Sequence, residues 1–177
     1  MKTRTLTLAA AIAAGGLAIM AGGMLNQAPA RQTGAEPPTS GAFTVDPVHS
    51  MVVFKIRHLG LANNYGRFNA PSGTFLIDPA NPGASMIDVS VKTEAVDTGN
   101  NKRDDHLRSA DFFNAKQFPS IAFKSREFRK TGDTSMVATG DLTMNGVTRS
   151  VEVEIQFLGE GNTPQGYKQG FEATFAI

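Results

Sequence analysis

Residues 151–158 of this sequence, VEVEIQFL, indicate its fold class more clearly than any other stretch. Apolar side chains occupy every second position from Val151 to Phe157, and charged or polar side chains fill the positions between them. Successive side chains of a β-strand point to opposite faces, so this pattern predicts a strand with one buried and one solvent-facing side.

The same alternation recurs along the chain. It appears in residues 52–59 (VVFKIRHL), residues 86–92 (MIDVSVK) and residues 171–177 (FEATFAI). Turn-forming pairs rich in Asp, Asn, Pro and Gly separate these segments. Asn145-Gly146 is the strongest of them, because both residues tolerate the positive φ that a type I′ hairpin turn requires. The chain is therefore predicted to be a succession of antiparallel strands.

One segment departs from this period. Residues 101–110 contain no β-branched side chain, carry Asp104 and Asp105 early, and place Arg108 four positions after Asp104. Early acids and this i,i+4 ion pair support a short α-helix. Many short strands with a single helix predict an all-β fold, either a sandwich or an antiparallel β-barrel. We favour the barrel, because no strand carries the charges that protect an exposed edge.

The N-terminal residues have a different character. Lys2 and Arg4 precede an apolar, uncharged run over residues 6–25, and small residues follow it at Ala28-Pro29-Ala30. This order is typical of a secretory signal peptide, predicted over residues 1–30, although a retained membrane anchor is the alternative. Residues 31–42 are predicted to be a flexible linker and residues 43–177 a single barrel domain. The protein is therefore expected to be periplasmic or secreted.

Composition narrows the classes of function. The net charge is +1 and no basic run occurs, so nucleic acid is not an expected partner. The sequence has no cysteine, which excludes disulfides and thiol chemistry. It has twelve phenylalanines but no tryptophan and two tyrosines. A phenylalanine-rich barrel interior suits either a solid core or a long apolar ligand.

Catalytic motifs are scarce. Neither a Gly-x-Ser-x-Gly elbow nor a phosphate-binding loop occurs. His49 and His106, with Asp104 and Asp105, leave open a metal-dependent or acid–base enzyme as the alternative hypothesis. We expect instead that the charges of residues 101–110 face water and pair with one another.

Three blocks of the sequence together resemble the YceI-like family of bacterial secreted proteins: VDPVHSMVVFKIRHLGLANNYGRF (residues 45–68), NNKRDDHLRSADFFNAKQFPSIAF (residues 100–123) and GDLTMNGVTRSVEVEI (residues 140–155). The resemblance implies a lipocalin-like antiparallel β-barrel with one short helix, whose interior binds a polyisoprenoid, an isoprenoid quinone or another long-chain amphiphile. It implies no catalytic activity and no cofactor other than such a lipid. It is also compatible with a homodimer and with peripheral contact with a membrane. Members of the family continue beyond the position of residue 177, so the C-terminal closing strands are expected to be missing from this sequence.

The barrel interior that this resemblance implies predicts a set of ligand-binding residues: Val52, Phe54, Ile56, His58, Phe68, Phe75, Phe112, Phe113, Phe118, Phe123, Ile155 and Phe157. His58, Asn63, Asn64 and Arg67 are predicted to lie in or beside the loop after the first strand, where they would meet a polar headgroup. Replacing Phe54 with Asp is expected to abolish lipid retention while leaving secretion intact. The leading hypothesis is a lipid-binding protein. The second is the metal-dependent or acid–base enzyme, and the third is a structural sandwich with a solid core.

Overall fold

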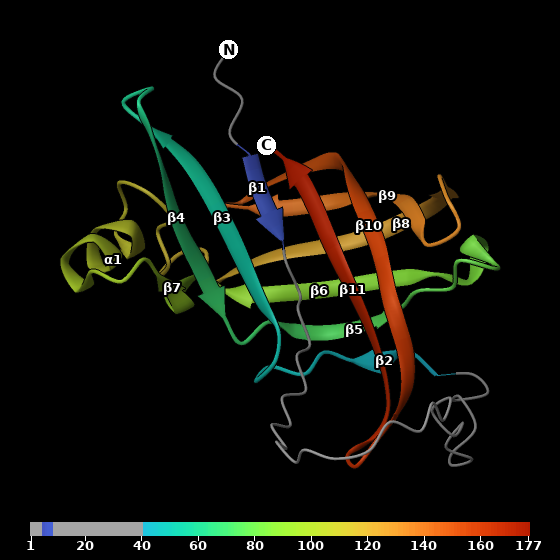
Figure 1. Ribbon diagram of the computed structural model, residues 1–177. Helices are drawn as coiled ribbons and strands as arrows, with labels where there is room; N and C mark the ends of the chain where they lie inside the picture. The colour runs from blue at the N-terminus through green and yellow to red at the C-terminus, as the bar shows by residue number, and fades with distance from the viewer. Residues whose placement is uncertain (1–4, 9–40) are drawn as a thin grey trace, which may run out of the picture.

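The computed structural model describes residues 5–8 and 41–177, which are built mainly of β-strands (Figure 1). The strands are β1 (Thr5–Leu8), β2 (Phe43–Thr44), β3 (Met51–His58), β4 (Ala62–Asn69), β5 (Ser72–Leu76), β6 (Met86–Lys92), β7 (Val96–Asp97), β8 (Ser120–Lys130), β9 (Ser135–Met144), β10 (Val147–Thr163) and β11 (Gly166–Ala176). The described residues add one α-helix, α1 (Asn101–Arg108), and the 3-10 turns η1 (Pro82–Ala84) and η2 (Thr93–Ala95).

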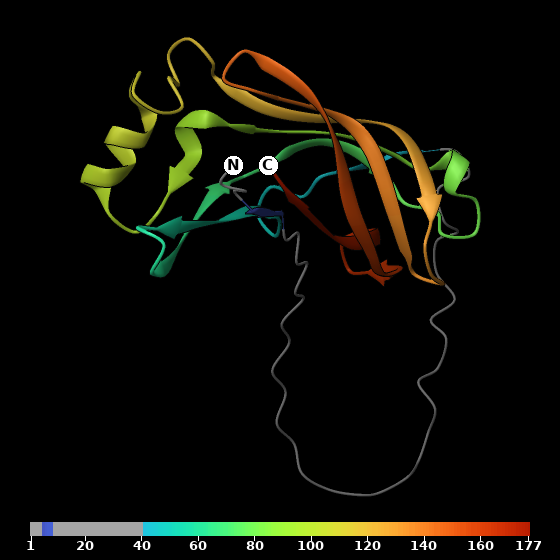
Figure 2. The ribbon, with the colours of Figure 1, turned by 90° about the horizontal axis from the view of Figure 1, so that it is seen from above.

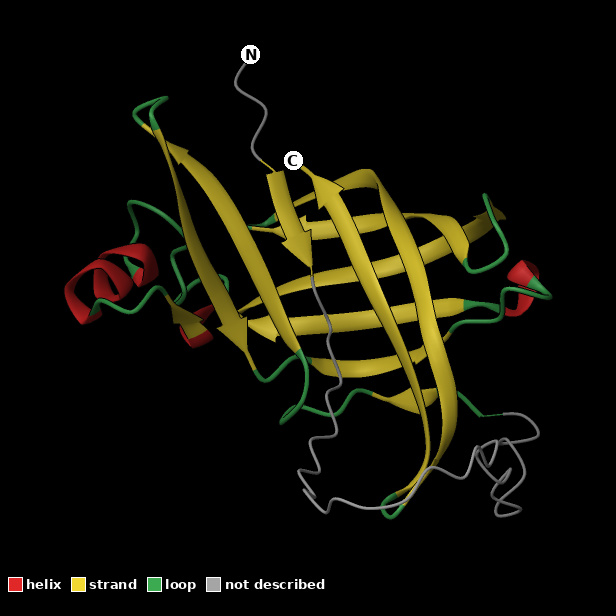
Figure 3. Cartoon of the chain, viewed as in Figure 1, coloured by secondary structure: helices red, strands yellow, loops and turns green. Residues whose placement is uncertain are grey.

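All the strands join one sheet in the order β2-β5-β6-β8-β9-β10-β11-β1-β3-β4-β7, and their pairings are antiparallel. The sheet curls so that β3, β4, β10 and β11 cross over β5, β6, β8 and β9, and α1 lies at one end (Figures 1, 2 and 3). The result is a nearly closed antiparallel barrel. The predicted all-β barrel with one short helix is confirmed.

The stretch that indicated the fold behaves as its alternation requires. Val153 and Ile155 are buried in β10, whereas Glu152, Glu154 and Gln156 are exposed. The turn into this strand uses Asn145 at φ 53° and Gly146 at φ 74°. Positive φ at both central residues defines the predicted type I′ turn. Local turn chemistry and hydrophobic period therefore agree along the β9–β10 hairpin.

The predicted signal peptide (residues 1–30) and linker (residues 31–42) fall largely on residues 1–4 and 9–40, outside the described residues. Residues 5–8 form β1, whose backbone lies between β11 and β3. Over residues 5–8 and 41–177, no helix has the length and apolar character that crossing a membrane requires.

Helix α1 begins and ends close to its predicted limits. The Asn100 side chain caps it by accepting a hydrogen bond from the Arg103 backbone N–H at 3.0 Å. One expectation was wrong: Asp104 does not face water but is 4% exposed, and it accepts bonds from the backbone N–H and the hydroxyl of Thr98. Arg108 consequently pairs with Asp105 at 2.9 Å rather than with Asp104. The helix is fastened to the barrel through this buried carboxylate.

Phenylalanine rings fill one end of the barrel core. Phe68 lies between Phe54 and Phe113, with ring centroids 5.5 Å and 5.3 Å away. The ring of Phe54 rests on Gly66 of the neighbouring strand, where an added Cβ would lie 2.3 Å from its Cζ. The ring of Phe123 rests on Gly140 in the same way, with Cζ at 2.6 Å from an added Cβ. Both glycines leave the space that an inward-pointing ring needs.

Candidate binding cavity

A predominantly apolar cavity lies inside the barrel, between the two crossing groups of strands. Its volume is about 90 Å³. The apolar residues that line it are Phe43, Val45, Met51, Val52, Pro71, Phe75, Val89, Val91, Ile121, Ala122, Phe123, Leu142, Phe171 and Phe175. The lining is therefore predominantly hydrocarbon.

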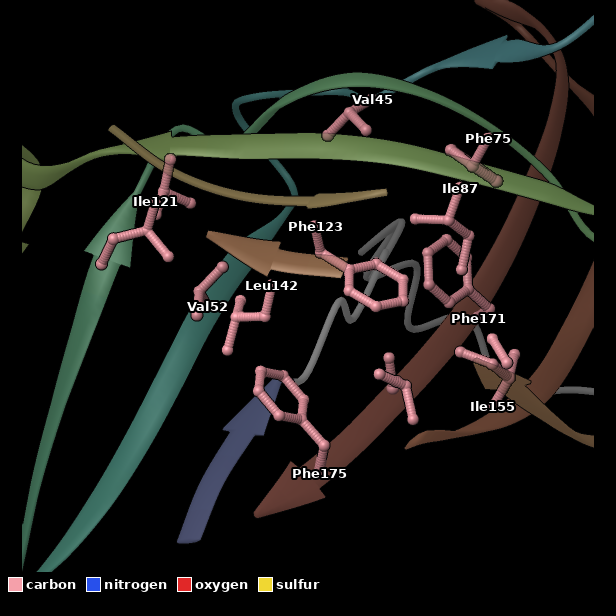
Figure 4. Packing of buried hydrophobic residues seen from close by; sticks show 14 of the residues in the cluster. Val45, Val52, Phe75, Ile87, Ile121, Phe123, Leu142, Ile155, Phe171 and Phe175 are labelled. Atoms are coloured by element: carbon pink, nitrogen blue, oxygen red, sulfur yellow. The ribbon is translucent and has the colours of Figure 1, made fainter. Parts of the chain in front are cut away.

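The alternating strands place these side chains. Figure 4 shows Phe123 of β8 and Leu142 of β9 pointing towards Phe171 and Phe175 of β11. All four are buried, with relative exposures of 5–7%. Residues two apart on one strand share a face, so each strand supplies more than one side chain to the same interior. Opposite walls of the barrel thereby meet across the cavity.

Aromatic rings in contact with one another form one side of the cavity. Phe75 lies between Phe43 and Phe171, with centroid distances of 5.7 Å and 4.8 Å. Phe43 also stacks on Tyr167 at 6.3 Å. Loss of hydration raises the pKa of the Tyr167 phenol, and the nearby Glu160 carboxylate raises it further. Tyr167 therefore stays neutral, and its ring stacks on Phe43 without itself lining the cavity.

Two polar residues of the lining, Gln169 and Asp46, already bond to protein groups. Gln169 is 4% exposed; its side-chain amide accepts from the Ile77 backbone N–H and donates to the Ile77 carbonyl, at 2.9 Å and 2.8 Å. Asp46 accepts bonds from the ring Nδ1 of His49 at 2.8 Å and from the Val48 backbone N–H at 2.9 Å. These bonds, led by that from His49, lower the pKa of Asp46. Among the described residues, no buried side-chain nitrogen or oxygen lacks a hydrogen-bond partner, so a ligand inside the barrel would meet few unsatisfied polar groups.

The twelve predicted ligand-binding residues fall into three groups. Val52, Phe75 and Phe123 line the cavity. A second group lies in or against the hydrophobic core without lining the cavity: Phe54, Phe68, Phe113, Ile155 and Phe157. A third group lies away from both: Ile56, His58, Phe112 and Phe118.

Strand length explains part of the third group. Strand β3 runs past the end of the barrel, so Ile56, on the same face as Phe54, is 41% exposed and His58 is exposed. Phe112 is 49% exposed and meets the His106 ring edge-on at 4.9 Å. Phe118 packs against Gly146 in the β9–β10 turn. Periodicity identifies a face of a strand but not where the barrel beneath it ends.

The predicted headgroup loop is a strand instead. Asn63, Asn64 and Arg67 all lie within β4, and Arg67 forms an ion pair with Asp97 at 2.8 Å. Phe54 is 6% exposed and packs on Phe68, so a carboxylate placed there would be buried without a partner. The substitution of Phe54 by Asp is therefore expected to prevent folding and cannot report on ligand binding alone.

Several cavity residues were not among those predicted. The alternation in residues 86–92 and 171–177 was sufficient to predict an inward-facing position for four of them: Val89, Val91, Phe171 and Phe175. No pattern marked Phe43 or Val45, because β2 has two residues and the chain between β2 and β3 is irregular.

The histidines and acids of the alternative hypothesis lie apart. His49 pairs with Asp46, His106 pairs with Asp111 at 3.2 Å, and Asp104 bonds to Thr98. In the part of the chain that the structure describes, no three His, Asp or Glu side chains come close enough to hold one metal ion. These residues form separate local contacts rather than one reactive group.

Comparison with known proteins gives a consistent result. A family model described as the YceI-like domain matches residues 43–177. A UPF0312 protein of Pseudomonas paraeruginosa is 44% identical over 130 residues, which cover 73% of this chain and 68% of that protein. Protein YceI of Escherichia coli O6:H1 is 46% identical over 126 residues, 71% of this chain and 65% of that protein.

Solved structures agree. The crystal structure of a Campylobacter jejuni YceI protein superposes with a TM-score of 0.57 at 35% identity, covering 73% of this chain and 76% of that one. Burkholderia cenocepacia BcnA shares the fold, with a TM-score of 0.59 at 18% identity over 72% of this chain and 94% of that one. The resemblance drawn from the three sequence blocks is confirmed.

Proposed function

This chain belongs to the YceI-like domain family, and from that premise we propose that it is an exported binding protein for a polyisoprenoid, an isoprenoid quinone or another long-chain amphiphile. The hydrocarbon tail lies inside the barrel and the polar head lies at its mouth. The proposed activity is binding alone, without chemical conversion of the ligand.

The observation that carries this proposal is the chemistry of the cavity lining. Fourteen of its twenty residues are apolar, and they come from strands on both walls of the barrel. The buried amide of Gln169 is already bonded to Ile77 on both its donor and its acceptor side. Such a lining recognises a ligand by removing hydrocarbon from water rather than by reading polar groups.

Energetics set a minimum length for the tail. Each buried CH₂ contributes about 0.8 kcal/mol, so ten carbons contribute roughly 8 kcal/mol and twenty about 16 kcal/mol. Association costs at least about 4 kcal/mol of lost freedom. The remainder corresponds to a millimolar dissociation constant for ten carbons and a nanomolar one for twenty, on the scale where about 1.4 kcal/mol is a factor of ten. A ligand that survives purification therefore has a tail nearer twenty carbons.

Such a tail requires the cavity to widen. A cavity of about 150 Å³ holds one benzene ring, and this cavity, at about 90 Å³, is smaller. Phe43 is the lining residue best placed to move, because β2 has two residues, lies at the end of the strand order and pairs with β5 alone. Short edge strands with few backbone bonds open at low free-energy cost.

The proposal is tested by extracting the protein, purified after expression with its own N-terminal segment, into organic solvent and identifying the released molecules by mass spectrometry. Val89→Trp and Leu142→Trp each place an indole in the cavity. Val147→Trp is the matched control, because Val147 is 54% exposed in the β9–β10 hairpin. We expect a long-chain lipid from the wild type and the control, and little from the two cavity variants.

Circular dichroism and thermal unfolding establish that each variant is folded, and Val89→Phe replaces any tryptophan variant that is not. Wild-type protein that releases no lipid would favour a solid-core structural role. Equal lipid in the cavity variants and in Val147→Trp would place the ligand elsewhere. Either result overturns the proposal.

A further inference from the structure

The end of the β3–β4 hairpin extends beyond the barrel. We call residues 55–61 the hairpin tip; Figures 1 and 3 show it projecting at the top left, away from the other strands. Its apolar side chains are open to solvent: Ile56 is 41% exposed, Leu59 80% and Leu61 85%. Large apolar side chains gathered at one projecting point are typical of a contact surface rather than of a core.

The backbone of the turn strengthens this interpretation. The Leu61 backbone N–H donates to the His58 carbonyl at 3.0 Å, and the two residues between them, Leu59 and Gly60, have φ of 52° and 75°. Turns with two positive φ values favour Asn, Asp or Gly, and a bulky apolar residue is uncommon there. Leu59 thus holds a large hydrocarbon group at an exposed position against local preference. Strain of this kind is concentrated at functional sites.

The charges near the tip have one sign. Residues 51–69 contain Lys55, Arg57 and Arg67 but no Asp or Glu. Arg67 is neutralised by Asp97, whereas no carboxylate of the described residues forms an ion pair with Lys55 or Arg57. The Arg57 guanidinium donates to the Gly60 carbonyl and to the Asn63 side chain, each at 3.3 Å, which holds it beside the turn.

We propose that the hairpin tip docks on the surface of an anionic phospholipid bilayer. Leu59 and Leu61 enter the boundary between headgroups and acyl chains, and Lys55 and Arg57 lie against lipid phosphates. Exposed apolar groups beside unpaired cations are the combination that binds such surfaces. A second copy of this chain is a poorer partner, because a two-fold contact through the tip would bring like charges together.

The absence of tryptophan from the sequence permits a site-specific test. Leu61→Trp places one fluorophore at the tip, and Leu158→Trp, at a leucine 57% exposed on β10, is the matched control. Vesicles of phosphatidylglycerol with phosphatidylethanolamine are compared with vesicles of phosphatidylcholine. Anionic vesicles are expected to shift the emission of Leu61→Trp to the blue and to leave that of Leu158→Trp unchanged. Because each signal is local, binding through residues 1–40 does not imitate this result.

Charge removal is the second arm of the test. Each cation near an anionic surface contributes about fivefold to partitioning, so Lys55→Gln with Arg57→Gln is expected to weaken binding of Leu61→Trp about thirtyfold. An unshifted emission, an equal shift in Leu158→Trp, or no effect of the two charge substitutions would overturn the proposal. A shift that rises with protein concentration without vesicles would assign the tip to a second copy instead. The lipid content of the cavity is measured separately, so a failure here is distinguishable from a failure of the proposed function.

Discussion

Substituting Gly66 with alanine tests whether the ring of Phe54 requires a bare backbone beneath it. The new Cβ would lie 2.3 Å from Cζ of Phe54 and 2.8 Å from both Cε atoms. Carbon atoms pack at about 3.5–4.0 Å, so the ring has to move by more than about 1 Å. Its movement is restricted, because it packs against Phe68 at 5.5 Å and Phe68 in turn packs against Phe113 at 5.3 Å.

Overpacking of this kind costs about 1–3 kcal/mol, and the lower chain entropy of alanine in the unfolded state returns about 0.4–1 kcal/mol. We therefore expect Gly66→Ala to lower the free energy of unfolding by about 1–2 kcal/mol, or the midpoint of thermal unfolding by roughly 2–8 °C. Urea unfolding followed by circular dichroism measures the first quantity and a thermal scan the second. Gly161→Ala is the control, because an added Cβ there meets nothing within 4 Å.

A double-mutant cycle identifies the cause. Phe54→Leu removes the ring atoms that the Cβ of Gly66→Ala would strike, so the two substitutions together should cost less than the sum of their separate costs, by more than about 0.5 kcal/mol. If Gly66→Ala is as stable as Gly161→Ala, or if its cost adds simply to that of Phe54→Leu, the ring-on-glycine argument is refuted.

Three further predictions test other contacts. Asp104→Ala leaves both donors of Thr98 without their buried acceptor, and it should lower the free energy of unfolding, measured in urea, by about 1–3 kcal/mol. Asp105→Ala removes an exposed ion pair and should change the same quantity by less than about 1 kcal/mol. Hydrogen bonds from the Gly99 backbone N–H and, second in size, from the Arg67 side chain lower the pKa of Asp97 below 3.8. The ionised carboxylate therefore stabilises the fold above pH 3.8, and this contribution is lost as the pH falls through the lowered pKa. Asp97→Asn should therefore unfold at a lower temperature than the wild type at pH 7, and the difference should close in acid; a constant difference would contradict this. Leu59→Asn relieves a positive φ and should raise the thermal midpoint slightly while weakening vesicle binding, and an unchanged affinity would contradict the docking role of Leu59.

The strands could be predicted from the sequence because a strand that is buried on one face alternates apolar and polar residues along a short stretch of chain. The period of two in residues 151–158 located the buried side of β10, and Asn145-Gly146 located its turn. The same period could not separate a cavity wall from a solid core, so Phe54 and Phe68 were grouped with Phe75 and Phe123. That distinction depends on which rings meet across the barrel, and such contacts join residues far apart in the chain.

The charged helix shows a second limit. Local pattern predicted where α1 lies and that Asp105 faces water, but gave no sign that Asp104 is buried. Its burial depends on Thr98, which precedes the helix and is held there by the pairing of β7 with β4. A carboxylate in a run of charges is buried or exposed according to partners outside the run.

The bond between Gln169 and Ile77 joins two parts of the barrel that are not neighbours in the sheet, β11 and the residue that follows β5. The Gln169 carboxamide makes the same two hydrogen bonds to the Ile77 backbone that a residue of a paired strand would make, and so it joins these two parts of the barrel. A ligand too wide for the barrel at this point has to break both hydrogen bonds, and the backbone amide proton of Ile77 then exchanges with solvent. The rate of hydrogen exchange at this one backbone amide would therefore report whether the barrel wall has opened, whichever ligand opens it.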